Sequence, residues 1–148
     1  ADATIELIRR RPRLARLGLG YADRLTDRNP DKVVKMITST WAPVDRRLVL
    51  CNRTLYRRLV ENLQMATCCG PEGVQRDITL LGSCWGFAVR EAAGVPISIW
   101  QGGCDPIVTP SMAHYFHSQL PGSELLIDPS AGHVTIFKQH VTDILTRF

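Results

Sequence analysis

The first half of the chain carries apolar residues at helical spacing. Leucine and isoleucine recur every three or four positions between residues 2 and 27, and Pro12 interrupts them. Because proline breaks a helix interior, this pattern predicts two helical pieces that meet near Arg11. Proline is also favoured in the first turn of a helix, so Pro30 and Pro43 predict the starts of two further helices.

The helical pattern continues beyond these starts. A longer amphipathic helix is predicted over 53–66, where leucines recur on one face, and a Gly-Pro pair at 70–71 ends the region. Shorter patterns predict helices over 74–81 and, at the end of the chain, over 134–148. Since no strand pattern interrupts the early helices, residues 1–70 are expected to form a helical domain without a sheet.

A strand–helix–strand unit is predicted in the second half. The apolar runs Pro96–Trp100 and Leu125–Ile127 are typical of buried strands. Between them, Thr109 and Pro110 start a helix that should end near Leu120. A helical crossover of this kind is right-handed and joins parallel strands. The predicted fold is therefore of the α/β class, mostly helical, with a small parallel two-strand sheet.

An acidic residue and a histidine follow the two predicted strands. Asp105 comes just after the first strand and His133 just after the second, so both should lie at the edge where open α/β sheets bind ligands. In a catalytic role, Asp105 would hold His133 in one tautomer and stabilise the imidazolium. The alternatives are a turn aspartate that caps backbone N–H groups before Pro106 and a loop histidine without a role. We expect the two side chains to lie close together.

These residues resemble the C-terminal part of the α/β-hydrolase family. The resemblance rests on Gly-Gly-Cys-Asp-Pro-Ile-Val at 102–108, on Gly-His at 132–133, on Trp-Gly-Phe at 85–87 and on the final helix. In that family the triad follows the chain order nucleophile, acid, histidine. By this resemblance Asp105 matches the acid and His133 the general base.

The resemblance also implies a domain division and a function. Residues 1–70 match the helical cap, or lid, and residues 71–148 the C-terminal portion of the core. The Gly-x-Ser-x-Gly turn that presents the nucleophile is missing, as are the family's earlier strands, and the first residue is not Met. We interpret the chain as a C-terminal fragment of a hydrolase for a small ester- or amide-like substrate, inactive alone because it lacks the nucleophile. A non-catalytic binding or assembly module is the alternative.

Composition and charge narrow the functional classes further. The 148 residues are 45% hydrophobic, enough for a core, and the net charge of +4 comes largely from arginines at 9, 10, 11, 13 and 16. Such a cluster could bind phosphates, but without interleaved aromatic residues a solvated helix face is the better interpretation, and no nucleic-acid partner is expected. No apolar run reaches the roughly 18 residues of a membrane span, and no signal peptide is evident. A cytoplasmic protein without a membrane partner is therefore expected.

Cysteine and histidine suggest neither a metal nor a cofactor. Five cysteines are present, at positions 51, 68, 69, 84 and 104. Their odd number rules out a complete disulfide framework and no Cys-x-x-Cys occurs, so buried reduced thiols are expected. Cys104 should fill the turn beside Asp105, since no activating partner for a nucleophile is evident. His114 and His117 could share a metal, but no third ligand is visible.

The predicted sheet suggests self-association. A two-stranded sheet is marginal on its own in water, and the strand Pro96–Trp100 would leave one row of backbone groups unpaired. Pairing with a second copy around a two-fold axis would complete the ladder. We therefore expect a homodimer.

Overall fold

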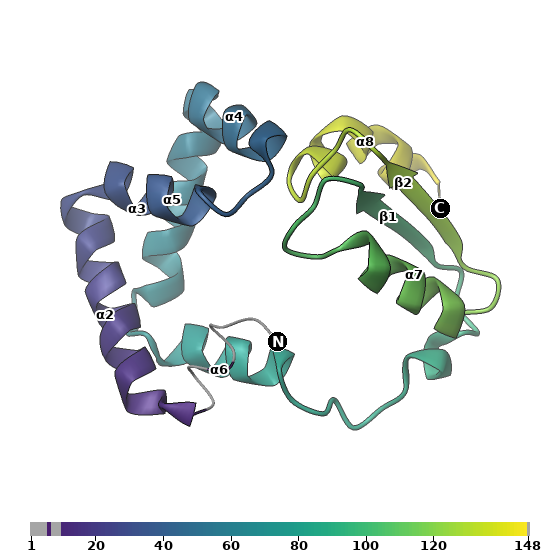
Figure 1. The fold of residues 1–148 in the computed structure, drawn as a ribbon, viewed down its shortest axis with the longest axis horizontal. Coiled ribbons are helices and arrows are strands. Elements are labelled where there is room, and N and C mark those ends of the chain that lie inside the picture. The colour runs from purple at the N-terminus through teal and green to yellow at the C-terminus, as the bar shows by residue number, and fades with distance from the viewer. Residues whose placement is uncertain (1–5, 7–9, 148) are drawn as a thin grey trace. The chain divides into compact units, whose positions relative to one another are not determined.

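A computed structural model describes residue 6 and residues 10–147 of the chain (Figure 1). The protein is mostly helical, with one small parallel sheet, as predicted. The elements in order are α2 (Pro12–Arg28), α3 (Pro30–Thr38), α4 (Pro43–Cys51), α5 (Arg53–Thr67), α6 (Glu72–Leu81), the 3₁₀ helix η1 (Val89–Ala92), β1 (Ser98–Gly102), α7 (Pro110–Gln119), β2 (Glu124–Asp128) and α8 (Thr135–Thr146). The predicted helical piece before Arg11 lies largely outside the described residues.

The described chain divides into two compact units. The first holds the residues up to Ile37 together with Arg53–Gly86, and the second holds Thr38–Asn52 together with the residues from Phe87 onward. This division differs from the boundary at residue 70 that the sequence suggested, because α4 belongs to the unit with the sheet. The identification of the units as the cap and core of a hydrolase stays a prediction.

In the first unit, α2 packs against α5 and α6. Arg16 of α2 forms an ion pair with Glu72 of α6, and the hydroxyl of Thr67 at the end of α5 donates to the carboxylate of Asp23 in α2. The described arginines of the N-terminal cluster, at positions 10, 11, 13 and 16, are all exposed. Their exposure fits a solvated helix face, and the absence of a phosphate or nucleic-acid partner stays a prediction. Arg9 lies outside the described residues.

The second unit is built on the strand–helix–strand pattern. β1 and β2 pair in parallel, from Ser98 opposite Glu124 to Gly102 opposite Asp128. α7 packs against both strands, and α8 packs against β1 (Figure 1). The first strand lies two residues further along than predicted. Proline has no N–H to donate, so the ladder begins only after Pro96. The predicted helix start is confirmed, with Pro110 in the first turn.

The exposure of the cysteines shows that the prediction of buried thiols was wrong. All five are exposed free thiols, although they were expected to be buried. The described positions explain this: Cys51 ends α4, Cys68 and Cys69 follow α5, and Cys104 lies in the turn after β1. Turns and helix ends lie at the surface, so the apolar character of cysteine did not decide its burial. Among the described residues, no helix combines the length and apolar character needed to cross a membrane.

The open sheet edge supports a test of the predicted homodimer. Within residues 10–147 the sheet has only the strands β1 and β2, so each has one edge that pairs with no other strand. We expect light scattering over a dilution series to report the mass of two chains at high concentration, because edge pairing satisfies the unpaired N–H and C=O groups. A mass of one chain at every concentration would exclude the dimer.

Candidate functional site

Asp105 and His133 form a hydrogen-bonded pair at the C-terminal end of the sheet. Asp105 lies in the turn after β1, and His133 lies between β2 and α8. His133 Nδ1 is 2.9 Å from Asp105 Oδ2, which confirms the predicted proximity. The carboxylate side is enclosed and the imidazole side is open: the side chain of Asp105 is 4% exposed and that of His133 is 43% exposed.

The two carboxylate oxygens of Asp105 have different partners. Oδ1 accepts hydrogen bonds from the backbone N–H groups of Ile107 (2.8 Å) and Val108 (3.0 Å), while Oδ2 faces His133. The turn-capping role that the sequence left as an alternative is therefore real, and it fixes the carboxylate that orients the imidazole. Cys104 fills the same turn as predicted, since its thiol donates to the carbonyl oxygen of Pro129 (3.1 Å).

Asp45 holds the backbone at His133, a role that the sequence did not reveal. Asp45 lies in α4 and is completely buried. Its Oδ2 accepts the N–H of His133 (2.6 Å), and its Oδ1 accepts the N–H groups of Val134 (3.1 Å) and Thr135 (2.8 Å) and the Thr135 hydroxyl (2.8 Å). A carboxylate at the N-terminus of α8 satisfies donors that have no partner within the helix and complements the helix dipole.

Glycines bring the two turns of the site into contact. A Cβ atom on Gly102 would lie 2.7 Å from the carbonyl oxygen of Ala131 and would also overlap the carbonyl oxygen of Gly132. Because this approach is possible, Gly103 N–H donates to Asp128 O (2.7 Å) and Cys104 N–H donates to Ala131 O (2.8 Å). These bonds set the spacing between the turn of Asp105 and the turn of His133.

The pair has the chemistry of an oriented general base. With Nδ1–H donating to Asp105, the acceptor lone pair of His133 is on Nε2, and Nε2 makes no hydrogen bond within residues 10–147. None of the serines that the sequence offers is a partner for it: Ser83 and Ser118 bond backbone carbonyls, Ser111 bonds Thr109, and Ser123 bonds His117. Among the described residues, therefore, no side-chain hydroxyl or thiol is hydrogen-bonded to the imidazole of His133.

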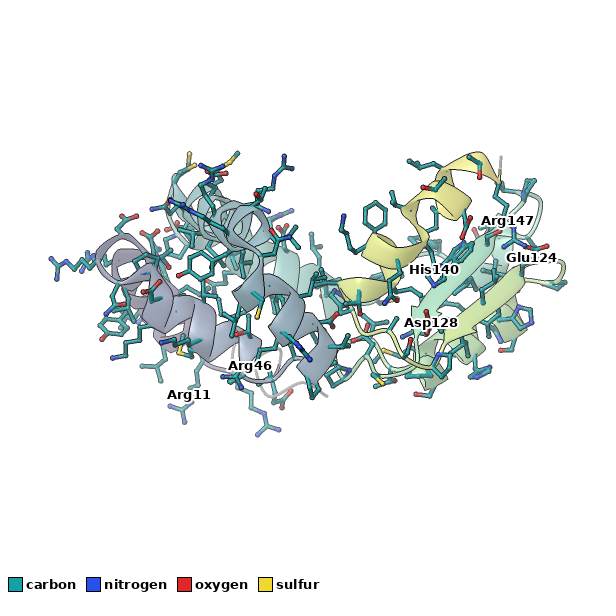
Figure 2. All side chains as sticks on the ribbon, turned by 90° about the horizontal axis from the view of Figure 1, so that it is seen from above. Arg11, Arg46, Glu124, Asp128, His140 and Arg147 are labelled. Carbon is teal, nitrogen blue, oxygen red and sulfur yellow. The ribbon has the colours of Figure 1, made fainter. Side chains whose placement is uncertain are left out.

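A second acid–histidine pair links α8 to β2 (Figure 2). His140 Nε2 is 2.9 Å from Asp128 Oδ2, its Nδ1 is 3.7 Å from Asp143, and its ring lies 5.2 Å from that of Trp100. The sequence alone assigned no role to either residue. Asp128 also accepts from the N–H and hydroxyl of Ser130, so it organises the loop that leads to His133.

The pKa shifts of this second pair predict the pH range in which it stabilises the fold. The hydrogen bond from His140, followed by those from Ser130, lowers the pKa of Asp128 from 3.8 to about 2, and the bond to Asp128 raises the pKa of His140 above 6.5. The stabilisation from Asp128 is lost as the pH falls toward 2, and that from His140 is lost as the pH rises through its raised pKa. The pair therefore stabilises the fold most between about pH 4 and 6.5.

We expect an NMR titration of the His140 ring protons to show a midpoint above 6.5, and a lower midpoint in Asp128→Asn. The stability difference between the wild type and His140→Gln should narrow as the pH is raised through that midpoint. Equal midpoints in the wild type and Asp128→Asn would contradict the assignment of the pair.

Among the described residues, His114 and His117 gain no third ligand that would complete a metal site. His117 Nδ1 lies 2.9 Å from the hydroxyl of Ser123. In the part of the chain that the structure describes, no three His, Cys, Asp or Glu side chains are grouped so that they could hold a metal ion.

Comparison with known proteins gives no relative from which a function could be transferred: no protein-family model, no curated protein and no solved structure matches the chain.

Proposed function

We propose that Asp105 and His133 are the acid and the general base of an α/β-hydrolase site for a small ester- or amide-like substrate. The observation that carries this proposal is the pair itself: a buried carboxylate 2.9 Å from the Nδ1 of a half-exposed histidine, each at the C-terminal end of one of two parallel strands. In this proposal the helices of the first unit belong to a cap, and the sheet unit is the C-terminal portion of the core.

In the proposed mechanism, His133, Asp105 and Asp45 each have one task. Nε2 of His133 takes the proton of the attacking hydroxyl and later returns it to the leaving group. Asp105 keeps the proton on Nδ1 and stabilises the imidazolium, while its bonds to Ile107 and Val108 prevent the carboxylate from turning away. Asp45 fixes the backbone of His133, so the ring stays where the nucleophile must arrive.

The nucleophile and most of the oxyanion hole belong to a polypeptide segment other than these 148 residues. The sequence has no Gly-x-Ser-x-Gly turn. None of Ser83, Ser111, Ser118 and Ser123 bonds His133. A cytoplasmic location and the dimer are part of the same proposal. The competing function is a binding or assembly module. In such a module the Asp105–His133 bond only closes a turn, and replacing His133 would not abolish the function.

An ester-hydrolysis assay tests the proposal. The 148-residue chain should hydrolyse a p-nitrophenyl ester no faster than buffer. The intact gene product, identified by its mass, should turn the ester over. His133→Ala should lower its kcat by about 10⁶-fold, because the general base is lost. Asp105→Asn should lower its kcat by about 10⁴-fold, because the imidazole is left in the wrong tautomer.

His114→Ala is the matched control, because His114 lies on α7 and makes no bond to the pair. It should leave kcat unchanged. Hydrolysis by the 148-residue chain that depends on His133 would contradict the missing nucleophile. An intact product that keeps its activity in both site variants would favour the binding module.

A further inference from the structure

Cys68 and Cys69 form an exposed pair of thiols directly after α5. Their sulfur atoms lie 3.7 Å apart, and both side chains are exposed. Consecutive Cα atoms are about 3.8 Å apart, whereas cysteines joined by a disulfide usually have Cα atoms about 4.4–6.8 Å apart. Direct neighbours are therefore poorly placed for an unstrained disulfide, and both thiols stay available for a ligand that bridges them.

The turn that carries the two thiols is anchored on both sides. The N–H of Cys68 donates to Met65 O (3.4 Å), and the N–H of Gly70 donates to Thr67 O (2.7 Å). The Thr67 hydroxyl donates to Asp23 of α2, which ties the end of α5 to its neighbour. Gly70 has a φ of +98°, a conformation that favours glycine. The backbone of the two cysteines is thus held by a hydrogen-bonded turn.

This spacing fits two bonds to a single soft atom. Bonds of about 2.3 Å at angles of about 90–110° place two thiolate sulfurs about 3.3–3.8 Å apart. Zinc in a structural site needs four protein ligands. No group of three or more potential ligands occurs among residues 10–147. The pair therefore suits a three-coordinate centre that brings its third substituent with it.

We propose that Cys68 and Cys69 together bind trivalent arsenicals that carry one organic group. In the reaction, R–As(OH)₂ forms two As–S bonds, two S–H and two As–O bonds break, and two water molecules leave. Arsenic stays trivalent, so neither an oxidant nor a reductant is required. The hydrogen bond with Cys69 raises the pKa of the Cys68 thiol.

Titration of the reduced chain with phenylarsine oxide tests this site. Intact mass should show one adduct per chain, and a chromogenic thiol reagent should then detect two fewer of the five thiols. Cys68→Ser and Cys69→Ser should each bind about 10²–10⁴-fold more weakly, because the second As–S bond gains from the high effective concentration of the neighbouring thiol.

A triple variant makes the test decisive. With Cys51, Cys84 and Cys104 all replaced by Ser, only the proposed pair remains, and one adduct should form with unchanged affinity. All the substituted thiols are exposed, and circular dichroism checks that the helices are retained. No adduct in the triple variant, or wild-type affinity in Cys68→Ser or Cys69→Ser, would overturn the proposal.

Discussion

Replacing Asp45 by Ala is expected to lower the unfolding free energy of the sheet unit by about 3–5 kcal/mol and to release the backbone of His133. The carboxylate is completely buried and accepts four hydrogen bonds, three of them from consecutive N–H groups at the start of α8. Hydrogen bonds to a charged group contribute about 1.5–3 kcal/mol each, and buried donors without partners are costly.

Asp45→Asn should be almost as damaging as Asp45→Ala. An amide has one oxygen, so its NH₂ group would face either the N–H of His133 or the donors of Val134 and Thr135. Urea unfolding gives the free energy, and hydrogen exchange of the amides at 133–135 should become faster in both variants.

Asp31→Asn is the matched control, because Asp31 also lies in the first turn of a helix but is exposed, and it accepts a hydrogen bond from the Tyr56 hydroxyl. Its effect should stay within about 0.5 kcal/mol. Unchanged exchange at 133–135 in Asp45→Ala would show that the carboxylate does not hold this segment.

Gly102→Ala is expected to destabilise the same unit by about 2–3 kcal/mol and to separate Asp105 from His133. The added methyl would meet the carbonyl oxygens of Ala131 and Gly132, which are backbone atoms and cannot rotate away as a side chain can. To make room, the two turns must move apart, and this strains the bond from Cys104 N–H to Ala131 O.

Thermal unfolding and NMR measure the two effects separately. The melting temperature should fall by on the order of 10 °C, and the downfield resonance of the His133 Nδ1 proton should weaken or disappear. Gly94→Ala is the matched control in the same unit, since a Cβ there meets no atom within 4 Å. A Gly102→Ala protein that keeps both the melting temperature and the Nδ1 resonance would show that the close approach is not required.

The local pattern of the sequence predicted the elements well. Prolines at 12, 30, 43 and 110 lie in the first turns of helices, as expected, and the two apolar runs are strands that pair in parallel. Helix starts and strand–helix–strand units depend on residues close together in the chain, so short stretches carry this information. The same topology rule brought Asp105 and His133 to one sheet edge, where they form a hydrogen bond.

The sequence did not determine which parts pack together. The division at residue 70 followed the change from helices to strands, whereas α4 joins the sheet unit and α5 and α6 join α2. Burial of the cysteines was predicted from their apolar character, and their positions at turns and helix ends made them exposed instead. Packing partners and exposure depend on the complete fold, which a local pattern does not describe.

By itself, then, the sequence determined the order of helices and strands and the edge at which an acid and a histidine meet. Only the tertiary structure decided which carboxylates hold the backbone of His133 and the ring of His140. Asp45 is 88 to 90 positions away from the three N–H groups that it accepts, and Asp128 is 12 positions from His140. In the sequence, Asp45 looks like an ordinary acidic residue in the first turn of α4. A capping bond between distant helices leaves no periodic signal, because its partners are brought together only by the fold.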